Sequence, residues 1–212
     1  RKGSSLIPQD APENTAVNNW IGEMEAKHNF VLYIANDQVN IWSKRCINQA
    51  DRVLIVANPQ ADPTPGPFEQ FLSQMEVPLR TELVQWHPPE TRQPKGTLTW
   101  LQPRQVLHHH HIRQNDPAHI NRLARRLSGH AIGLVLSGGA ALGFTQKGVY
   151  KAVLELDIPL DYVGGVSMGS IMGGMMVTGH SFAEFEAYAR QSDKLGVLDY
   201  TLPLAAPTRS KN

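Results

Sequence analysis

Short runs rich in valine, isoleucine and leucine recur along the chain, separated by segments with helical spacing of apolar residues. The strand-like runs lie at 30–35, 52–57, 81–86, 131–136 and 162–166. Such runs are typical of parallel strands covered on both faces. Apolar residues at helical spacing lie at about 20–30, 41–49, 68–75, 116–127, 145–156 and 168–177. The pattern predicts an α/β fold built from parallel-sheet, three-layer units.

Proline-rich and polar stretches divide this pattern into segments. We expect a polar linker, a Rossmann-like α/β accessory unit, a connecting loop with a helix, and a second α/β unit, at residues 1–19, 20–105, 106–128 and 129–212. The loop at 87–115 has room for one short strand at 97–101. Asp116 and Pro117 have the residue types of an N-cap and a first helical position. Ser181 and Glu184 have the spacing of a capping box, which predicts a last helix from there to about residue 190.

Composition narrows the class of protein. Of 212 residues, 41% are hydrophobic and 18% charged, as in an ordinary globular protein. The net charge of +1, with no long block of like charge, gives no reason to expect a nucleic-acid partner. The single cysteine, Cys46, cannot form an internal disulfide, and no apolar run approaches the ~20 residues of a membrane-spanning helix. The chain begins at Arg1 without a signal-peptide pattern, so we expect a segment of a longer cytoplasmic protein.

The strongest chemical signal is Gly165-Val166-Ser167-Met168-Gly169, a G-x-S-x-G pentapeptide between a strand and a helix pattern. A serine at such a sharp turn projects its hydroxyl away from the backbone. Gly165 and Gly169 let the chain turn without Cβ clashes. Ser167 is therefore the candidate nucleophile for acyl transfer. A buried serine in a tight turn is the structural alternative.

A second glycine-rich turn, residues 137–143, follows the preceding strand. Adjacent parallel strands would place both turns at the same edge of the sheet. Acyl transfer needs N–H donors where negative charge develops on the carbonyl oxygen. We expect an oxyanion hole from backbone N–H groups of Gly138, Gly139, Ala140 and Met168. No metal ion or other cofactor is expected.

The stretch LVLSGGAALGFTQKGVYKAVLELDIPLDYVGGVSMGSIMGGMMVTG, residues 134–179, resembles the start of a patatin-like phospholipase domain. The segments VLYIAND, QADRVLIVAN and HHHIR, and a helix ending RLARRLSG, resemble bacterial proteins like neuropathy target esterase. The resemblance implies an esterase of phospholipids or lysophospholipids with a Ser–Asp dyad in an α/β hydrolase-type domain. It also implies peripheral membrane contact and cyclic-nucleotide-binding-like modules upstream.

The sequence departs from that family at two points. Ala140 and Leu142 stand where the family usually has glycine and arginine. The chain has no Asp-Gly dipeptide, the motif that carries the family's general base, so we expect it to end before the catalytic aspartate. A degenerate lipid-binding or regulatory pseudoenzyme is the alternative. A nucleotide site is disfavoured because neither glycine turn has a G-x-G-x-x-G or Walker pattern.

Several residues that could have a functional role are predicted to be structural instead. The helix after Ser167 carries three methionines that we expect in the core rather than in an acyl channel, namely Met172, Met175 and Met176. Asp161 is rejected as the general base because it precedes the strand and so lies ~20 Å from Ser167. Residues 108–111, four histidines, are expected to form a surface loop and not a metal site. Arg122, Arg125 and Arg126 are expected on a solvated helix face rather than on anionic lipid.

Overall fold

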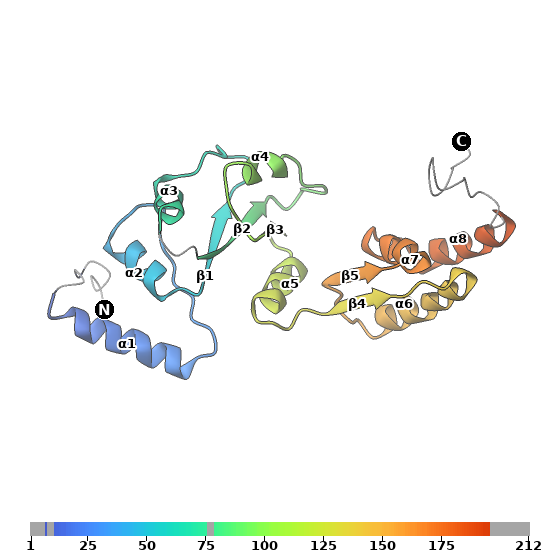
Figure 1. The fold of residues 1–212 in the computed structure, drawn as a ribbon, viewed down its shortest axis with the longest axis horizontal. Coiled ribbons are helices and arrows are strands. Elements are labelled where there is room, and N and C mark those ends of the chain that lie inside the picture. The colour runs from blue at the N-terminus through green and yellow to red at the C-terminus, as the bar shows by residue number, and fades with distance from the viewer. Residues whose placement is uncertain (1–6, 8–10, 76–78, 196–212) are drawn as a thin grey trace. The chain divides into compact units, whose positions relative to one another are not determined.

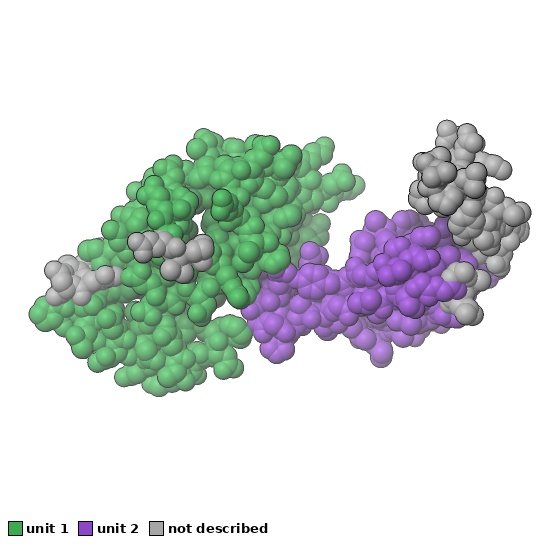
Figure 2. Space-filling view, viewed as in Figure 1, with its two compact units in different colours: residues 1–120 green, residues 121–212 purple. Residues whose placement is uncertain are grey.

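The computed structural model of the chain describes residues 7, 11–75 and 79–195. The chain divides into two compact units, residues 1–120 and residues 121–212 (Figure 2). The division into four segments expected from the sequence stays a prediction.

The first unit is built on a parallel sheet, as the apolar runs predict (Figure 1). Its strands are β1 (Arg52–Ala57), β2 (Arg80–His87) and β3 (His108–Arg113), in the order β1-β2-β3. Its helices are α1 (Asn14–Lys27), α2 (Ile41–Gln49), α3 (Pro67–Ser73) and α4 (Thr97–Leu101). Ala57, Leu83 and Trp100 form the buried core between the sheet and α4. Parallel strands joined through helices confirm the predicted α/β class.

Two predicted strands of this unit are wrong. Residues 30–35 are not a strand: Leu32 and Ile34 are each 84% exposed, and β1 pairs only with β2 among the described residues. A strand needs a hydrogen-bonded neighbour, which the sequence pattern of one segment does not supply. Residues 97–101 form a helix that begins after Gly96, at φ 73°, and its Trp100 is buried with Ala57 and Leu83. Helix α1 also begins at Asn14, within the expected linker.

The four histidines at 108–111 belong to strand β3 rather than to a surface loop. Alternation along the strand separates their side chains onto two faces. On one face the His110 Nε2 atom lies 2.6 Å from the buried Glu82 carboxylate, which also accepts from Arg52 Nη1 at 3.0 Å. On the other, His111 Nδ1 lies 2.8 Å from His87 Nε2. The four polar histidines therefore form a strand because they pair with β2 and because two of them contact side chains of that strand.

Helix α5 (Pro117–Leu127) begins as predicted, with Asp116 Oδ1 accepting from the Ala118 N–H at 3.1 Å. The second unit then pairs β4 (Gly133–Leu136) in parallel with β5 (Tyr162–Gly165). Its remaining elements are the 3-10 helix η2 (Ala140–Thr145) and the helices α6 (Gln146–Glu155), α7 (Met168–Val177) and α8 (Phe182–Leu195).

The core of the second unit lies between the two strands and these helices. Leu136, Tyr150, Met172, Met176 and Phe185 are buried in it, and Met175 packs against them, which confirms the core interpretation of the methionines. Helix α8 begins at the predicted capping box, in which Ser181 and Glu184 exchange hydrogen bonds between side chains and backbone N–H groups.

An ion pair joins α5 to the start of β5, so the solvated interpretation of Arg125 is wrong. Its Nε and Nη2 atoms donate to the two oxygens of the buried Asp161 carboxylate at 2.8 and 2.6 Å. The Ile132 N–H donates to the same carboxylate at 2.9 Å. These hydrogen bonds, the one from Arg125 foremost, lower the pKa of Asp161 below its usual value. Asp161 is thus a structural anchor. It precedes the amino end of β5, whereas Ser167 follows the carboxyl end of the same strand.

We expect Asp161→Asn to lower the free energy of unfolding by about 3 kcal/mol at pH 7, because it leaves Arg125 without its counter-charge. The native pKa of Asp161 is depressed, so this contribution is present above the unfolded value of 3.8 and is lost as pH falls through the native value. Urea unfolding of the variant and the unaltered protein between pH 7 and pH 3 measures the loss of stability and its dependence on pH. The control Glu155→Gln breaks an exposed pair with Lys151 and should change stability by less than about 0.5 kcal/mol. Equal effects of the two substitutions would contradict the anchoring role.

Candidate active site

Ser167 lies in a sharp turn between the end of β5 and the start of α7. Its backbone has φ 53° and ψ −124°, a conformation that non-glycine residues rarely adopt and that costs about 1–3 kcal/mol. Its carbonyl accepts the Ser170 N–H at 2.9 Å and the Ser170 hydroxyl at 2.6 Å. The side chain of Ser167 is exposed. The alternative of a buried turn serine is therefore excluded by the geometry.

The flanking glycines are required by space rather than by their own dihedral angles. A Cβ on Gly165 would lie 2.3 Å from the Gly169 carbonyl oxygen. A Cβ on Gly169 would lie 2.3 Å from the Leu136 carbonyl oxygen and 2.6 Å from that of Ser137. The start of α7 therefore rests directly on the backbone that leaves β4. Glycine at both positions allows the turn to close this tightly.

The first glycine-rich turn lies against the same serine, at the carboxyl edge of the β4–β5 pair. A Cβ on Gly138 would lie 3.2 Å from Ser167 Cβ and 3.9 Å from its Oγ. Gly139, at φ 148°, then directs the chain into η2 at Ala140. The side chains of Ala140 and Leu142 lie outside the described atoms. The structure thus brings the two predicted turns together.

The backbone N–H of Met168 lies at the N-terminus of α7, directly after Ser167. It is the first residue of α7, and within the described part of the chain its N–H has no backbone acceptor, whereas the N–H groups of Gly169 and Ser170 bond to Val166 and Ser167. A helix N-terminus also carries partial positive charge. The roles predicted for Gly138, Gly139, Ala140 and Met168 stay predictions; of the first turn, Gly138 is the residue whose position against Ser167 is shown.

Two supporting contacts were not foreseen from the sequence. Gln146 Nε2 donates to the Ser137 carbonyl at 2.6 Å and so fixes the first turn from the start of α6. Gly143 lies against Met168, where a Cβ would approach Met168 Cγ to 2.3 Å. A glutamine at a helix start gives no sequence signal for such a role, since only the packing of η2 on α7 brings these residues together.

No general base accompanies Ser167 among the described side chains. Its Oγ has no hydrogen bond to any of them, and Asp161 is held by Arg125. His180 follows the ten-residue helix α7, about 15 Å along the helix axis, and its Nδ1 atom lies 2.9 Å from the Thr178 hydroxyl. Asp199 lies outside the described residues. The described residues therefore bring an exposed serine next to a glycine-rich turn, and none of their side chains is bonded to its hydroxyl as a base.

Within the described ranges, no group of three or more histidine, cysteine, aspartate or glutamate residues is placed to hold a metal ion. None of the described helices combines the length and apolar character needed to span a bilayer.

Family models match both parts of the chain. The Neuropathy Target Esterase family P-loop like domain matches residues 10–130, and the patatin-like phospholipase domain matches residues 134–201. No solved structure matches the chain. The second match contains both glycine-rich turns and Ser167.

Curated relatives align with three quarters of the chain or more. Patatin-like phospholipase domain-containing protein 7 of Rattus norvegicus is 32% identical over 97% of this chain and 18% of its own length. Neuropathy target esterase sws of Drosophila sechellia is 32% identical over 96% of this chain and 16% of its own length. Lysophospholipase NTE1 of Yarrowia lipolytica is 33% identical over 75% of this chain and 15% of its own length. The chain thus spans less than a fifth of the length of these relatives.

Proposed function

The chain belongs to the neuropathy target esterase family of patatin-like phospholipases, and we propose that the full-length protein is a serine esterase that hydrolyses fatty-acyl esters of phospholipids or lysophospholipids. One observation carries the proposal: Ser167 is exposed in a strained turn, with the Gly138 backbone beside its hydroxyl. Relatives named phospholipase, esterase and lysophospholipase support the substrate class.

The reaction follows from the two turns. The Ser167 Oγ attacks the acyl carbonyl carbon and its proton passes to a general base. The negative charge on the former carbonyl oxygen is stabilised by N–H groups of the 138–140 turn and of Met168. The tetrahedral intermediate then releases the alcohol part of the lipid, which takes the proton, and leaves an acyl ester on Ser167. Water, activated by the same base, hydrolyses that ester and restores the serine.

We propose that the general base is an aspartate outside the 212 residues, forming a Ser–Asp dyad with Ser167. Two observations support an incomplete domain. No described carboxylate hydrogen-bonds to Ser167, although serine needs a base at pH 7. Val135, on β4, is 82% exposed, whereas parallel sheets are normally covered on both faces. Further chain packed on that face would bury Val135.

The lipid substrate class leads us to propose a cytoplasmic protein that contacts a membrane surface peripherally. Cyclic-nucleotide-binding-like modules upstream of this chain are part of the same proposal, since the relatives are more than five times longer than the aligned segment. Neither proposal rests on a residue within the chain.

Labelling of the full-length protein with a long-chain alkyl fluorophosphonate tests the esterase proposal directly. We expect one adduct per chain, located by tryptic mass spectrometry on Ser167, because an activated serine beside N–H donors attacks phosphorus as it attacks an acyl carbon. Ser170, three residues later and also exposed, is an internal control and should stay unmodified. Absence of an adduct at Ser167 would favour the alternative, a degenerate lipid-binding or regulatory module in which Ala140 and Leu142 have replaced the family's usual residues.

A further inference from the structure

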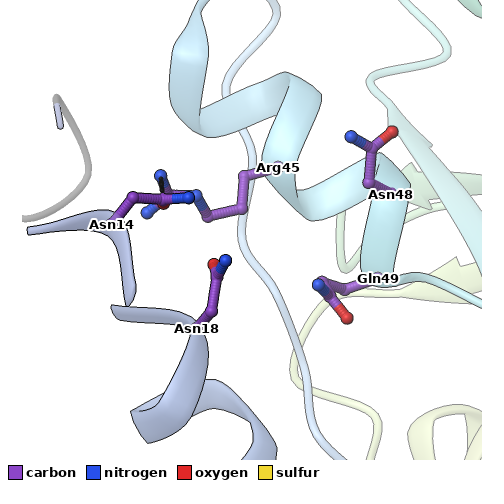
Figure 3. A pocket seen from close by; sticks show the side chains of 5 residues that line it. All are labelled: Asn14, Asn18, Arg45, Asn48 and Gln49. Carbon is purple, nitrogen blue, oxygen red and sulfur yellow. Dashed lines mark hydrogen bonds between the residues drawn. The ribbon is translucent and has the colours of Figure 1, made fainter. Parts of the chain in front are cut away.

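A polar cavity of about 280 Å³ lies between α1 and α2 of the first unit, on elements that carry no part of the Ser167 site. Its lining consists of four carboxamide side chains and one guanidinium, from Asn14, Asn18, Arg45, Asn48 and Gln49 (Figure 3). Asn14 and Asn18 are four residues apart on α1, and Arg45, Asn48 and Gln49 have i, i+3, i+4 spacing on α2. Each set therefore shares one helix face. Among the described residues, no acidic side chain lines the cavity.

Arg45 is the unusual member of this group. Its side chain extends from α2 toward the start of α1, and the residue is only 2% exposed (Figure 3). Its Nη2 atom donates to the Ile7 carbonyl at 3.0 Å and to Asn14 Oδ1 at 2.5 Å. Its Nε and Nη1 atoms are buried and have no hydrogen-bond partner in the described part of the chain. No carboxylate of the described chain forms an ion pair with it, so a full positive charge is buried with two donors unused.

Burying an unpaired charge is strongly unfavourable, and a fixed arginine without a counter-charge indicates an anion that is bound part of the time. Guanidinium donors match the geometry of phosphate oxygens in a bidentate way. The surrounding carboxamides offer N–H₂ groups for the remaining oxygens. The cavity volume is just below the ~300–1,000 Å³ of pockets that enclose drug-sized ligands, so it suits a small polar group rather than a whole lipid.

We propose that this cavity binds a phosphate group, carried by a small soluble phosphate ester or by a lipid headgroup. Arg45 is the charged ligand, and Asn18, Asn48 and Gln49 supply neutral donors. A bound anion then gives the buried Arg45 side chain a counter-charge, and both helices contribute to this single site. Binding should also draw α1 and α2 together, since the ligand contacts both.

Calorimetric titration of the full-length protein with inorganic phosphate at low ionic strength tests the site. We expect saturable binding of one phosphate per cavity, weakened at least about tenfold by Arg45→Gln. Lys44→Gln removes the same charge from the exposed neighbouring position of α2 and should leave phosphate affinity unchanged. Asn48→Asp places a negative charge at the exposed rim of the cavity and should also weaken binding. Gln60→Glu, which adds the same charge outside the cavity, is its control.

Two further titrations distinguish the source of the phosphate. Arg45-dependent binding of glycerol 3-phosphate identifies a soluble ester. Arg45-dependent binding of vesicles of phosphatidylcholine and phosphatidic acid, without binding of glycerol 3-phosphate, identifies a lipid headgroup. If Arg45→Gln does not fold, as circular dichroism would show, Asn48→Asp carries the test. The proposal is overturned if none of the three probes binds, or if the variants Arg45→Gln and Asn48→Asp bind as tightly as the unaltered protein.

Discussion

Replacing Ser167 by alanine should lower kcat for hydrolysis of p-nitrophenyl acyl esters by at least about 10⁴-fold in the full-length protein. The substitution removes the only atom that can form the acyl-enzyme. It leaves the backbone donors of the 138–140 turn and of Met168 in place. Residual binding with little turnover is therefore the expected kinetic result. Alanine also fits the site sterically, although the turn at φ 53° remains strained.

The control for this variant is Ser170→Ala, one helical turn further along α7. The Ser170 hydroxyl donates to the Ser167 carbonyl, which the Ser170 N–H already contacts, so its loss should leave most of the activity. Steady-state kinetics on both variants, with thermal unfolding to verify folding, separates a chemical role from a structural one. Activity of Ser167→Ala comparable to that of Ser170→Ala would show that the nucleophile lies elsewhere.

The largest effect on stability is expected from Gly169→Ala, which should lower the free energy of unfolding by about 3 kcal/mol or more. The new Cβ would lie 2.3 Å from the Leu136 carbonyl oxygen and 2.6 Å from that of Ser137, and backbone atoms cannot move aside as a flexible side chain can. Relief of the clash requires α7 to move away from β4. Such a movement displaces Ser167 from the first glycine-rich turn, and a shift of about 1 Å can cost about 10²-fold in rate.

Gly174→Ala is the matched control, since it makes the same chemical change five residues along the same helix. A Cβ at Gly174 would meet no atom within 4 Å. Alanine is favoured over glycine in a helix interior by about 1 kcal/mol, so this variant should be slightly more stable. Urea unfolding of both variants measures the difference. Similar stabilities would mean that the close contact between α7 and the end of β4 does not exist in solution.

Local sequence signals were sufficient where one segment determines its own conformation. The pentapeptide around Ser167 predicts the turn, because the contact that requires glycine at position 165, with the Gly169 carbonyl oxygen, lies within the pentapeptide itself. Asp116 before Pro117, and Ser181 before Glu184, predict helix starts for the same reason, since the capping partners lie within three residues. The core position of Met172 likewise follows from its place on an apolar helix.

Other predictions were wrong where the conformation or burial of a segment depends on residues distant in sequence. The run at 30–35 has strand-like residues but no paired neighbour among the described strands. The four histidines form a strand because Glu82 and His87 on β2 bond to two of them. The sequence predicts Arg125 on a solvated helix face, whereas in the structure it bonds to Asp161, 36 residues later. The residue spacing within α5 does not predict a partner outside that helix.

Sequence alone determined the chemistry offered by this chain: a serine in a glycine-flanked turn, a second glycine-rich turn before it, and the α/β class that would bring the two to one edge. These follow from sterics and periodicity, which act over a few residues. The tertiary structure decided which side chains are buried with or without partners. It placed Gly138 against Ser167, tied Asp161 to Arg125, and left the Arg45 guanidinium enclosed between two helices. Burial depends on contacts between distant segments, and for that reason it becomes visible only in the folded chain.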